Sequence, residues 1–250
     1  MYSLFRKFLF LFDAETMHVF SLNMLSFFEA AGLLKVFLKK RIDAPVTVMG
    51  IKFPNAVGLA AGLVKNASHI DALAQCGFGF IEVGTVTPLA QPGNDKPRLF
   101  RLAEDKAIIN RMGFNNAGVD ALVDNVKQSK KSCVLGINIG KNKVTPLENA
   151  ADDYLICMQQ VYAYADYITI NISSPNTPGL RELQHGEGLS SLLMLLKNKQ
   201  AESEKLHHRY VPLAVKIAPD LESEEIIDIA ERLLSANIDA VIATNTTSSR

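Results

Sequence analysis

The chain has 250 residues, of which 48% are hydrophobic and 21% are charged, and its 26 basic and 26 acidic side chains cancel to a formal net charge of zero. A neutral chain has no general attraction to nucleic acid, so we expect no nucleic-acid partner. This size and composition are typical of one large α/β domain, because barrel folds of about 250 residues form single domains.

The first 41 residues differ from the rest, because they hold eight of the 13 phenylalanines. Asp13 is placed to cap a helix over residues 17–28, and Gly32 can end that helix before the apolar segment 33–38. The longest apolar run, residues 8–12, is too short to span a bilayer. The pattern leaves two interpretations open: an amphipathic segment in a membrane interface, or a helical arm packed on its own domain or on a partner.

A strand–helix alternation begins at residue 44. Segments 46–49 and 51–53 flank Gly50 and indicate a hairpin. We expect the strands of a sheet at residues 57–60, 80–83, 134–137, 168–172, 212–217 and 240–243. We expect helices near residues 68–76, 117–127, 149–162, 189–197 and 223–234. A long segment rich in proline and glycine separates the second strand from its helix, at residues 88–112.

These units favour a (β/α)8 TIM barrel, of which only six βα units are present, over a doubly wound sheet. The expected crossovers are right-handed. Each predicted strand ends in a small or polar residue, and these ends are residues 60–62, Gly84-Thr85, Asn138, Asn171, Lys216 and residues 244–246. In a barrel such residues meet at the C-terminal rim, where active sites lie.

Residues 167–181 carry the densest polar cluster of this rim. A buried β-branched strand is followed by Asn171, Ser173, Ser174, Asn176 and Thr177, beside two prolines. A connecting loop needs turn formers but not this many amides and hydroxyls, so the cluster indicates a rigid site for a polar, planar ligand. The alternative is an ordinary Asn/Pro turn.

The rim residues suit a planar heterocycle with carbonyl and anionic groups, such as a flavin or a pyrimidine carboxylate. Lys65 or Arg111 can hold a carboxylate, and Lys216 can stabilise negative charge on a flavin ring. No Gly-x-Gly-x-x-Gly follows the first strand, so a nicotinamide site is not expected. The five histidines are scattered, and His207-His208 is typical of a solvated helix end, so we expect no metal.

The three cysteines, Cys76, Cys133 and Cys157, are widely spaced and have no CxxC partner. This spacing indicates a reducing compartment and buried apolar roles. No A-x-A-like site follows the first apolar run, so no cleavable signal peptide is predicted.

Six motifs then carry a resemblance to a known family. They read QPGNDKPRLF (91–100), NRMGF (110–114), GINIGK (136–141), NISSPNTPGLR (171–181), VKIAPD (215–220) and ATNTT (243–247). Together they closely resemble the quinone-linked, membrane-associated class 2 dihydroorotate dehydrogenases, in particular the enterobacterial type. The resemblance covers the whole chain, including its phenylalanine-rich start.

The resemblance implies oxidation of dihydroorotate to orotate in pyrimidine (UMP) biosynthesis, with FMN as hydride acceptor and a quinone as final electron acceptor. It implies that Ser174 removes a proton from C5 while a hydride leaves C6, with Thr177 and the loop near Phe114 lining the proton's route. Class 1 enzymes carry cysteine where Ser174 stands. The resemblance also divides the chain into an N-terminal amphipathic helical segment for membrane binding and quinone access, residues 1–41, and a C-terminally incomplete barrel that binds FMN and substrate, residues 42–250. It implies a peripheral protein on the cytoplasmic face of the inner membrane.

Site residues are carried over from the matching motifs. The substrate contacts that the resemblance implies are Lys65, Asn110, Arg111, Met112, Gly113, Phe114, Asn171, Asn176, Asn245 and Thr246. The flavin contacts that it implies are Ala61, Gly62, Leu63, Val64, Lys65, Thr85, Asn138, Asn171, Lys216 and Thr244.

The chain departs from the family pattern in two places. Val64 stands where the family usually has aspartate. The change is mild if the flavin contact there is through the backbone, and it lowers substrate affinity if the carboxylate orients Lys65. The chain also stops at Arg250, before two further strands whose loops bind the FMN phosphate in the family. We therefore expect an incomplete sequence, with natural truncation as the alternative.

Two other functions remain open. One is a non-catalytic, membrane-bound fragment of the enzyme. The other is a different FMN barrel that acts on a pyrimidine ring, against which the motif around Ser174 and the phenylalanine-rich segment argue.

Overall fold

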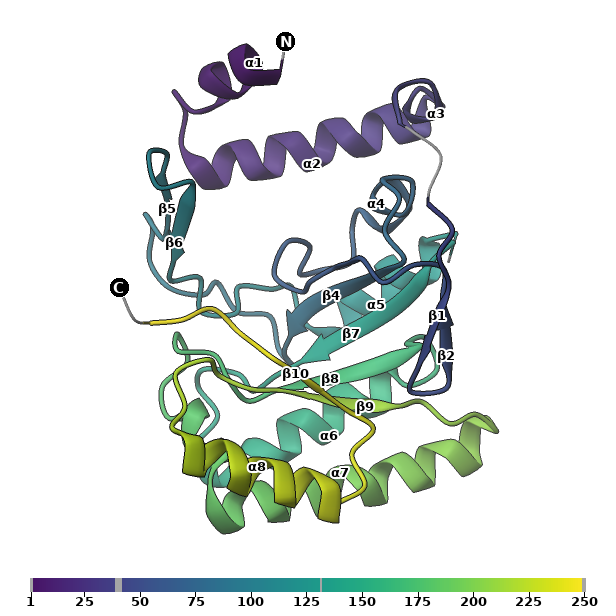
Figure 1. The fold of residues 1–250 in the computed structure, drawn as a ribbon, viewed down its shortest axis with the longest axis vertical. Helices are drawn as coiled ribbons and strands as arrows, with labels where there is room; N and C mark the ends of the chain where they lie inside the picture. Colours follow the sequence, from purple (N-terminus) through teal and green to yellow (C-terminus); the bar gives the residue numbers. More distant parts are fainter. Residues whose placement is uncertain (1, 39–41, 131, 249–250) are drawn as a thin grey trace.

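The computed structural model describes residues 2–38, 42–130 and 132–248 (Figure 1). Residues 39–41, where the boundary between the two predicted domains falls, lie outside this range. The central sheet has the strand order β10-β9-β8-β7-β4-β3, and every pairing in it is parallel. Its strands are β3 (Gly58–Leu59), β4 (Phe80–Val86), β7 (Val134–Ile139), β8 (Tyr167–Asn171), β9 (Leu213–Lys216) and β10 (Ala240–Ile242).

The strand order distinguishes a barrel from a doubly wound sheet. The strands lie side by side in the order in which they occur in the chain, with no reversal. A doubly wound sheet reverses direction at a switch point, whereas a barrel adds each strand beside the last one. The prediction of an α/β barrel with six strands present is therefore confirmed.

The two faces of the sheet differ in chemistry because side chains alternate along each strand. On β7 and β8, Ile137, Ile139, Ile168 and Ile170 are fully buried and belong to the hydrophobic core beneath the helices. The residues between them point to the opposite face, which forms the interior of the barrel. That face carries the polar side chains of Glu82, Asn138, Thr169, Asn171 and Lys216, all buried. The ligand site is built on this polar face.

Five helices cover the apolar face: α4 (Ile70–Ala74), α5 (Val119–Gln128), α6 (Ala150–Val161), α7 (Gly186–His207) and α8 (Ser223–Ser235). Short 3₁₀ turns, η1 (Leu147–Asn149) and η2 (Leu180–Gln184), precede α6 and α7. Helix α7 continues well beyond residue 197, where the predicted helix ended. It does so because Leu196, Gln200 and Ser203 follow one another at helical spacing and are all buried.

Two hairpins stand outside the sheet. The predicted one pairs β1 (Val46–Val48) with β2 (Ile51–Phe53), and its turn residues Met49 and Gly50 have φ of 54° and 75°. The second pairs β5 (Leu99–Leu102) with β6 (Ala107–Asn110). It lies within the proline- and glycine-rich segment, for which no strand was predicted. Its strands are mostly exposed or half-buried, so they lack the apolar alternation that would reveal them.

Three helices form the N-terminal segment: α1 (Tyr2–Leu9), α2 (Ala14–Ala30) and α3 (Leu34–Phe37). The predicted cap is confirmed, since Asp13 Oδ1 accepts a hydrogen bond of 2.8 Å from the Thr16 backbone N–H. Gly32 follows α2 with φ of 71°. Helix α1 lies within the segment that was predicted to be helical as a whole, although no separate helix was predicted at residues 2–9. Figure 1 shows α2 lying across the molecule beside the β5–β6 hairpin and α4, with α1 beyond it. Within the part of the chain described, no helix is long and apolar enough to cross a bilayer.

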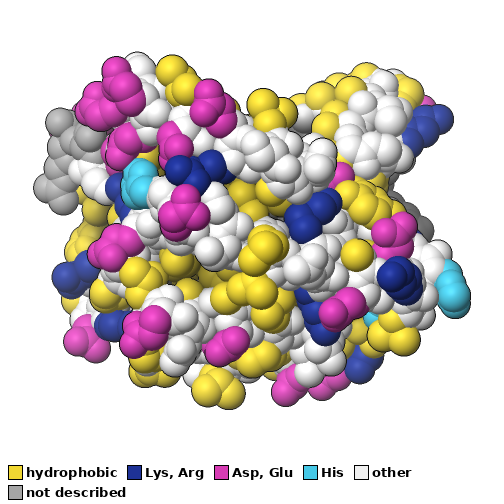
Figure 2. Space-filling model, turned by 90° about the horizontal axis from the view of Figure 1, so that it is seen from below, with side chains coloured by type: hydrophobic (Ala, Val, Ile, Leu, Met, Phe, Trp, Pro, Cys, Tyr) yellow, Lys and Arg dark blue, Asp and Glu magenta, His cyan; other side chains and the backbone are white. Residues whose placement is uncertain are grey.

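The surface charges, the cysteines and the exposed histidines can each be compared with the sequence predictions. Acidic and basic side chains are interspersed over the face shown in Figure 2.

Cys157 is fully buried, and burial raises the pKa of its thiol. Cys133 is half-buried and Cys76 is exposed, so the prediction of a buried role is wrong for Cys76, which lies just after α4 ends. His207 and His208 are exposed at the end of α7, as predicted.

Candidate active site

A cavity of about 330 Å³ opens at the carboxyl ends of the strands, between the barrel rim, α2 and the β5–β6 hairpin. Pockets for small ligands typically start at about 300 Å³. Most of the predicted site residues line it: Ala61, Gly62, Leu63, Lys65, Thr85, Asn110, Met112, Gly113, Phe114, Asn171, Ser174, Asn176, Lys216, Asn245 and Thr246. These residues come from segments far apart in the sequence, so the fold brings the predicted motifs together.

Four predicted residues do not line the cavity. The exposed Arg111 points away from it and donates to the Pro97 carbonyl from Nε at 3.2 Å and from Nη2 at 2.9 Å. Thr244 is exposed and donates from Oγ1 to the Asn245 carbonyl at 2.9 Å. Asn138 lies below the cavity floor, fully buried.

Val64 is the fourth. Its side chain is packed in the hydrophobic core, and its carbonyl accepts a 3.1 Å hydrogen bond from Gly84 N–H. Lys65 does not depend on a neighbouring carboxylate for its position, since its Nζ donates to the Gly62 carbonyl at 3.0 Å. This geometry favours the milder of the two predicted consequences of valine at this position.

Four lining residues were not predicted: His18, Leu99, Ile108 and Pro175. His18 belongs to α2, and Leu99 and Ile108 belong to the β5–β6 hairpin. Their contribution depends on the long-range packing of the N-terminal segment over the rim. Leu99 and Pro175 fall inside the motifs, which is the one signal that could have indicated them.

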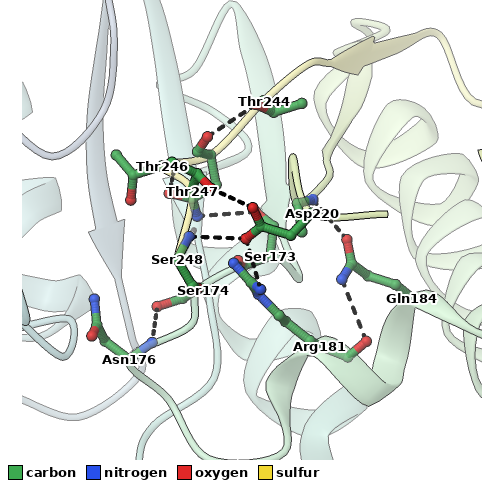
Figure 3. Close-up of polar contacts among 12 residues, drawn as sticks. Ser173, Ser174, Asn176, Arg181, Gln184, Asp220, Thr244, Thr246, Thr247 and Ser248 are labelled. Carbon is green, nitrogen blue, oxygen red and sulfur yellow. Dashed lines mark hydrogen bonds and ion pairs between the residues drawn. The ribbon is translucent and has the colours of Figure 1, made fainter. Parts of the chain in front are cut away.

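Ser174 stands in the loop that follows β8, and its side chain is buried against the cavity. Its Oγ accepts a 3.2 Å hydrogen bond from the Asn176 backbone N–H, as Figure 3 shows. Among the described residues, no histidine or carboxylate donates to or accepts from this hydroxyl. Ser174 therefore lacks the adjacent base that activates serine in a hydrolytic triad, which argues against acyl transfer as its chemistry.

A chain of buried hydrogen bonds runs beneath the cavity. Glu82 Oε1 accepts from Asn138 Nδ2 at 2.8 Å. Asn138 Oδ1 in turn accepts from Thr85 Oγ1 at 2.5 Å and from Asn171 Nδ2 at 3.2 Å. Asn171 Nδ2 also donates to Thr85 Oγ1 at 2.8 Å, and Asn171 Oδ1 accepts from Ser173 Oγ at 3.1 Å. A carboxylate can only accept, so Glu82 fixes the orientation of the Asn138 amide and, through Asn138, that of the Asn171 amide.

The second oxygen of Glu82 is held by two hydroxyls. Tyr167 OH and Thr169 Oγ1 each donate to Oε2 at 3.0 Å. Burial, followed by the charge of Glu82, raises the pKa of Tyr167 well above its usual value, so its hydroxyl remains a donor. The carboxylate is thus satisfied by neutral donors, and its network stays in place without a cation.

Two lysines supply positive charge to the cavity. Burial, followed by the charge of Arg98, lowers the pKa of Lys65, and Glu15 opposes this shift. The Lys216 side chain is buried at 8% exposure on the cavity wall, and within the described residues its ammonium makes no hydrogen bond. A lysine on the wall of this cavity suits a ligand that brings negative charge or carbonyl oxygens to it.

The described residues contain no group of three or more histidine, cysteine or acidic side chains placed to hold a metal ion.

The fold and the site define the class of protein: a parallel (β/α)-barrel protein whose polar ligand site lies at the carboxyl ends of its strands. A family model for dihydroorotate dehydrogenase matches residues 44–250, and the chain belongs to this family. The quinone-linked resemblance carried by the motifs is supported by its relatives.

Two relatives are named dihydroorotate dehydrogenase (quinone). The one from Saccharophagus degradans is 61% identical over 250 residues, which is 100% of this chain and 74% of the relative. The one from Idiomarina loihiensis is 63% identical over 250 residues, 100% of this chain and 75% of the relative. The crystal structure of DHODH in complex with ferulenol from Eimeria tenella is 40% identical, with a TM-score of 0.81, over 92% of this chain and 67% of that one. The chain thus spans about three quarters of the length of its sequence relatives.

Proposed function

We propose that this protein oxidises dihydroorotate to orotate, with FMN as hydride acceptor and a quinone as final electron acceptor. The observation that carries the proposal is the meeting of Ser174, Lys65 and Lys216 on one cavity at the barrel rim. The names of relatives about 60% identical to the chain support the same activity.

The residues present fit the ring of FMN. Ala61 and Gly62 are small and permit close approach of a planar ring to the backbone, and the amide of Asn171 is held in one orientation from below. Lys216 places an uncompensated positive charge on the wall of the same cavity. When bound, FMN supplies the hydride acceptor, and a cation beside the ring favours the added electrons.

The chain's own residues divide the remaining work. Ser174 takes the proton from C5 of dihydroorotate at its Oγ. Asn176, Asn245 and Thr246 lie on the same wall and bind the pyrimidine ring, while Lys65 binds its carboxylate. Thr177 and Phe114 line the route by which the proton leaves. Arg111 has no part in carboxylate binding in this geometry.

Helix α2 of the N-terminal segment and the β5–β6 hairpin form a second side of the cavity. His18 of α2 and Leu99 and Ile108 of the hairpin line it, and this is where we place the quinone. Beyond them, α1 and the turn after it expose large apolar side chains: Phe5, Phe8, Phe10, Leu11 and Phe12. We propose that these side chains enter the membrane interface, so that residues 1–41 hold the protein peripherally on the cytoplasmic face of the inner membrane.

The membrane proposal is tested with phospholipid vesicles. The protein is expected to sediment with them, and Phe8→Glu with Phe12→Glu is expected to leave it in the supernatant. Sedimentation that the two substitutions do not change would contradict this placement.

The activity is tested by anaerobic mixing with dihydroorotate while flavin absorbance is followed. The protein is expected to carry a flavin spectrum that bleaches on mixing. Ser174→Ala is expected to keep the spectrum and to bleach about 10²–10⁴-fold more slowly, the usual loss for a positioned proton acceptor. Undiminished bleaching would refute the role of Ser174, and a protein without flavin absorbance would favour the non-catalytic alternative.

A further inference from the structure

Asp220 lies between two loops of the site, and Figure 3 shows how it contacts both. It follows β9, in the connection to α8. Its Oδ1 accepts from Thr247 Oγ1, and its Oδ2 accepts from the Ser248 backbone N–H at 2.9 Å. Both donors belong to the loop after β10, which carries Asn245 and Thr246 into the cavity.

The same carboxylate reaches the loop after β8 through Arg181. Arg181 Nη1 donates to Asp220 Oδ2 at 3.2 Å, and Arg181 Nε donates to the Ser173 carbonyl at 3.2 Å. Ser173 immediately precedes Ser174. One guanidinium therefore joins the backbone beside the proposed base to the carboxylate that holds the opposite loop.

The pair is partly shielded from solvent, with side chains of Arg181 and Asp220 that are 28% and 21% exposed. Arg181 Nη2 is buried, and within the described residues it has no hydrogen-bond partner. An unsatisfied buried donor opposes stability, so the placement of Arg181 is not optimal for the stability of the fold at this atom.

The two loops also touch directly. Asn245 Nδ2 donates to Ser173 Oγ at 3.0 Å, and Asn245 Oδ1 accepts from the Thr246 N–H at 2.8 Å. The lining residues Ser174, Asn245 and Thr246 thus sit one or two positions away from the residues that the Asp220–Arg181 pair holds.

We propose that Asp220 and Arg181 are positioning residues that hold Ser174 at a fixed separation from Asn245 and Thr246. The inference rests on the proposed function. Neither residue lines the cavity, so the pair acts through the two loops. An error of about 1 Å in such a placement can cost a reaction about a hundredfold in rate.

The charge of Asp220 persists at any pH used for an assay. Hydrogen bonds from Thr247 and Ser248, followed by those of Arg181, lower the pKa of Asp220 to about 2. A test of the pair therefore needs substitution rather than acidification.

A matched pair exists elsewhere on the chain. Arg232 Nε contacts both oxygens of Asp228, at 2.9 Å and 2.8 Å, within α8. Neither residue lines the cavity. Asp220→Ala and Arg181→Met are therefore compared with Asp228→Ala and Arg232→Met, which remove an acid–arginine pair of the same kind.

Steady-state kinetics separate the two loops. Arg181→Met is expected to lower kcat about tenfold or more with little change in KM, because it frees the Ser174 side alone. Thr247→Val is expected mainly to raise KM, and Asp220→Ala is expected to do both. The substitutions at Asp228 and Arg232 are expected to change neither constant by more than about twofold.

Hydrogen–deuterium exchange without ligand provides a second readout that does not depend on activity. Asp220→Ala is expected to speed exchange in residues 173–181 and 244–248, while Asp228→Ala leaves both segments unchanged. If Asp220→Ala and Asp228→Ala showed equal exchange rates and equal kinetic constants, the inference would be overturned. Failure of the unsubstituted protein to oxidise dihydroorotate would overturn the proposed function instead, and the exchange result would still decide whether the pair holds the loops.

Discussion

Glu15 of α2 and Arg98, just before β5, form a two-point ion pair between the N-terminal segment and the barrel. Arg98 Nη2 lies 2.7 Å from Oε1 and Nε lies 3.1 Å from Oε2, with side chains that are 7% and 12% exposed for Arg98 and Glu15. Arg98 Nη1 also donates to the carbonyls of Pro92 and Asn94. The hydrogen bond from Arg98 is the main reason that the pKa of Glu15 is lowered.

Glu15→Gln is expected to loosen the N-terminal segment, because it leaves the buried charge of Arg98 uncompensated. Removing one partner of a buried pair costs roughly 3 kcal/mol. Trypsin is expected to cleave between residues 1 and 41 up to about a hundredfold faster, while the barrel unfolds at nearly the same temperature.

Lys130→Met is the control. Lys130 pairs with Glu29, which lies on α2 as Glu15 does, but Lys130 is 69% exposed. Exposed pairs contribute about 0.2–1 kcal/mol, so this variant should be cleaved like the unsubstituted protein. Equal cleavage of both variants would show that the Glu15–Arg98 pair does not hold the segment.

Two histidines make the attachment of this segment sensitive to acid. His69 Nδ1 lies 2.7 Å from Ser26 Oγ on α2, and His18 faces the cavity from α2. Burial is the first cause of the lowered pKa of both residues, followed by His18 for His69 and by Lys65 for His18. In the unfolded chain both have a pKa near 6.5.

The sign of the effect follows from these directions. Between pH 6.5 and the lowered pKa values, the unfolded chain binds protons that the folded chain does not. The contribution of these histidines to the free energy of unfolding is therefore fully present above pH 6.5 and is lost as the pH falls from 6.5 to the lowered values. The unfolding temperature is expected to drop between pH 7.5 and 5, and less so in His69→Gln, which keeps a hydrogen-bonding side chain. His208→Asn, at an exposed position, should follow the unsubstituted curve. If the His69→Gln protein also followed the curve of the unsubstituted protein, His69 would not be a source of the acid sensitivity.

The central sheet could be predicted from sequence because its physical signal is local. Alternation along β7 and β8 places isoleucines on one face and Asn138, Thr169 and Asn171 on the other, and the polar strand ends marked the rim correctly. The strands of the β5–β6 hairpin lack such a pattern, since they are mostly exposed or half-buried. Helix α1 is amphipathic, but its apolar side chains Phe5 and Phe8 are exposed and are not part of the core. Their positions depend on packing between distant parts of the chain.

Within two of the motif segments, one residue turns away from the site while its sequence neighbours line it. Asn110 and Met112 line the cavity while Arg111 points away, and Leu63 and Lys65 line it while Val64 enters the core. A motif therefore marks the segment that forms the site but not every residue in it that faces the ligand. His18 shows the opposite case, since no motif includes it and only the packing of α2 places it there.

Asn138→Leu is expected to disconnect the amides beneath the cavity while nearly preserving side-chain shape. It leaves Glu82 Oε1, the Thr85 hydroxyl and the Asn171 amide without the partners they have now. Unsatisfied buried groups cost about 1–3 kcal/mol each, so the free energy of unfolding in urea should fall by at least about 2 kcal/mol. The Asn171 amide keeps its hydrogen bonds to Thr85 and Ser173 but loses the one to Asn138, so its orientation is less firmly held. We expect orotate affinity, measured by calorimetry, to fall about tenfold.

Thr169→Val separates this effect from simple loss of stability. It also removes a donor from Glu82, but from Oε2, where Tyr167 still donates. It should cost about 1 kcal/mol of stability and leave orotate affinity unchanged, because the amide chain through Asn138 stays connected. If both variants lost affinity in proportion to their loss of stability, the network would be only structural. If Asn138→Leu alone lost affinity, Glu82 would act on the ligand through the orientation of Asn171.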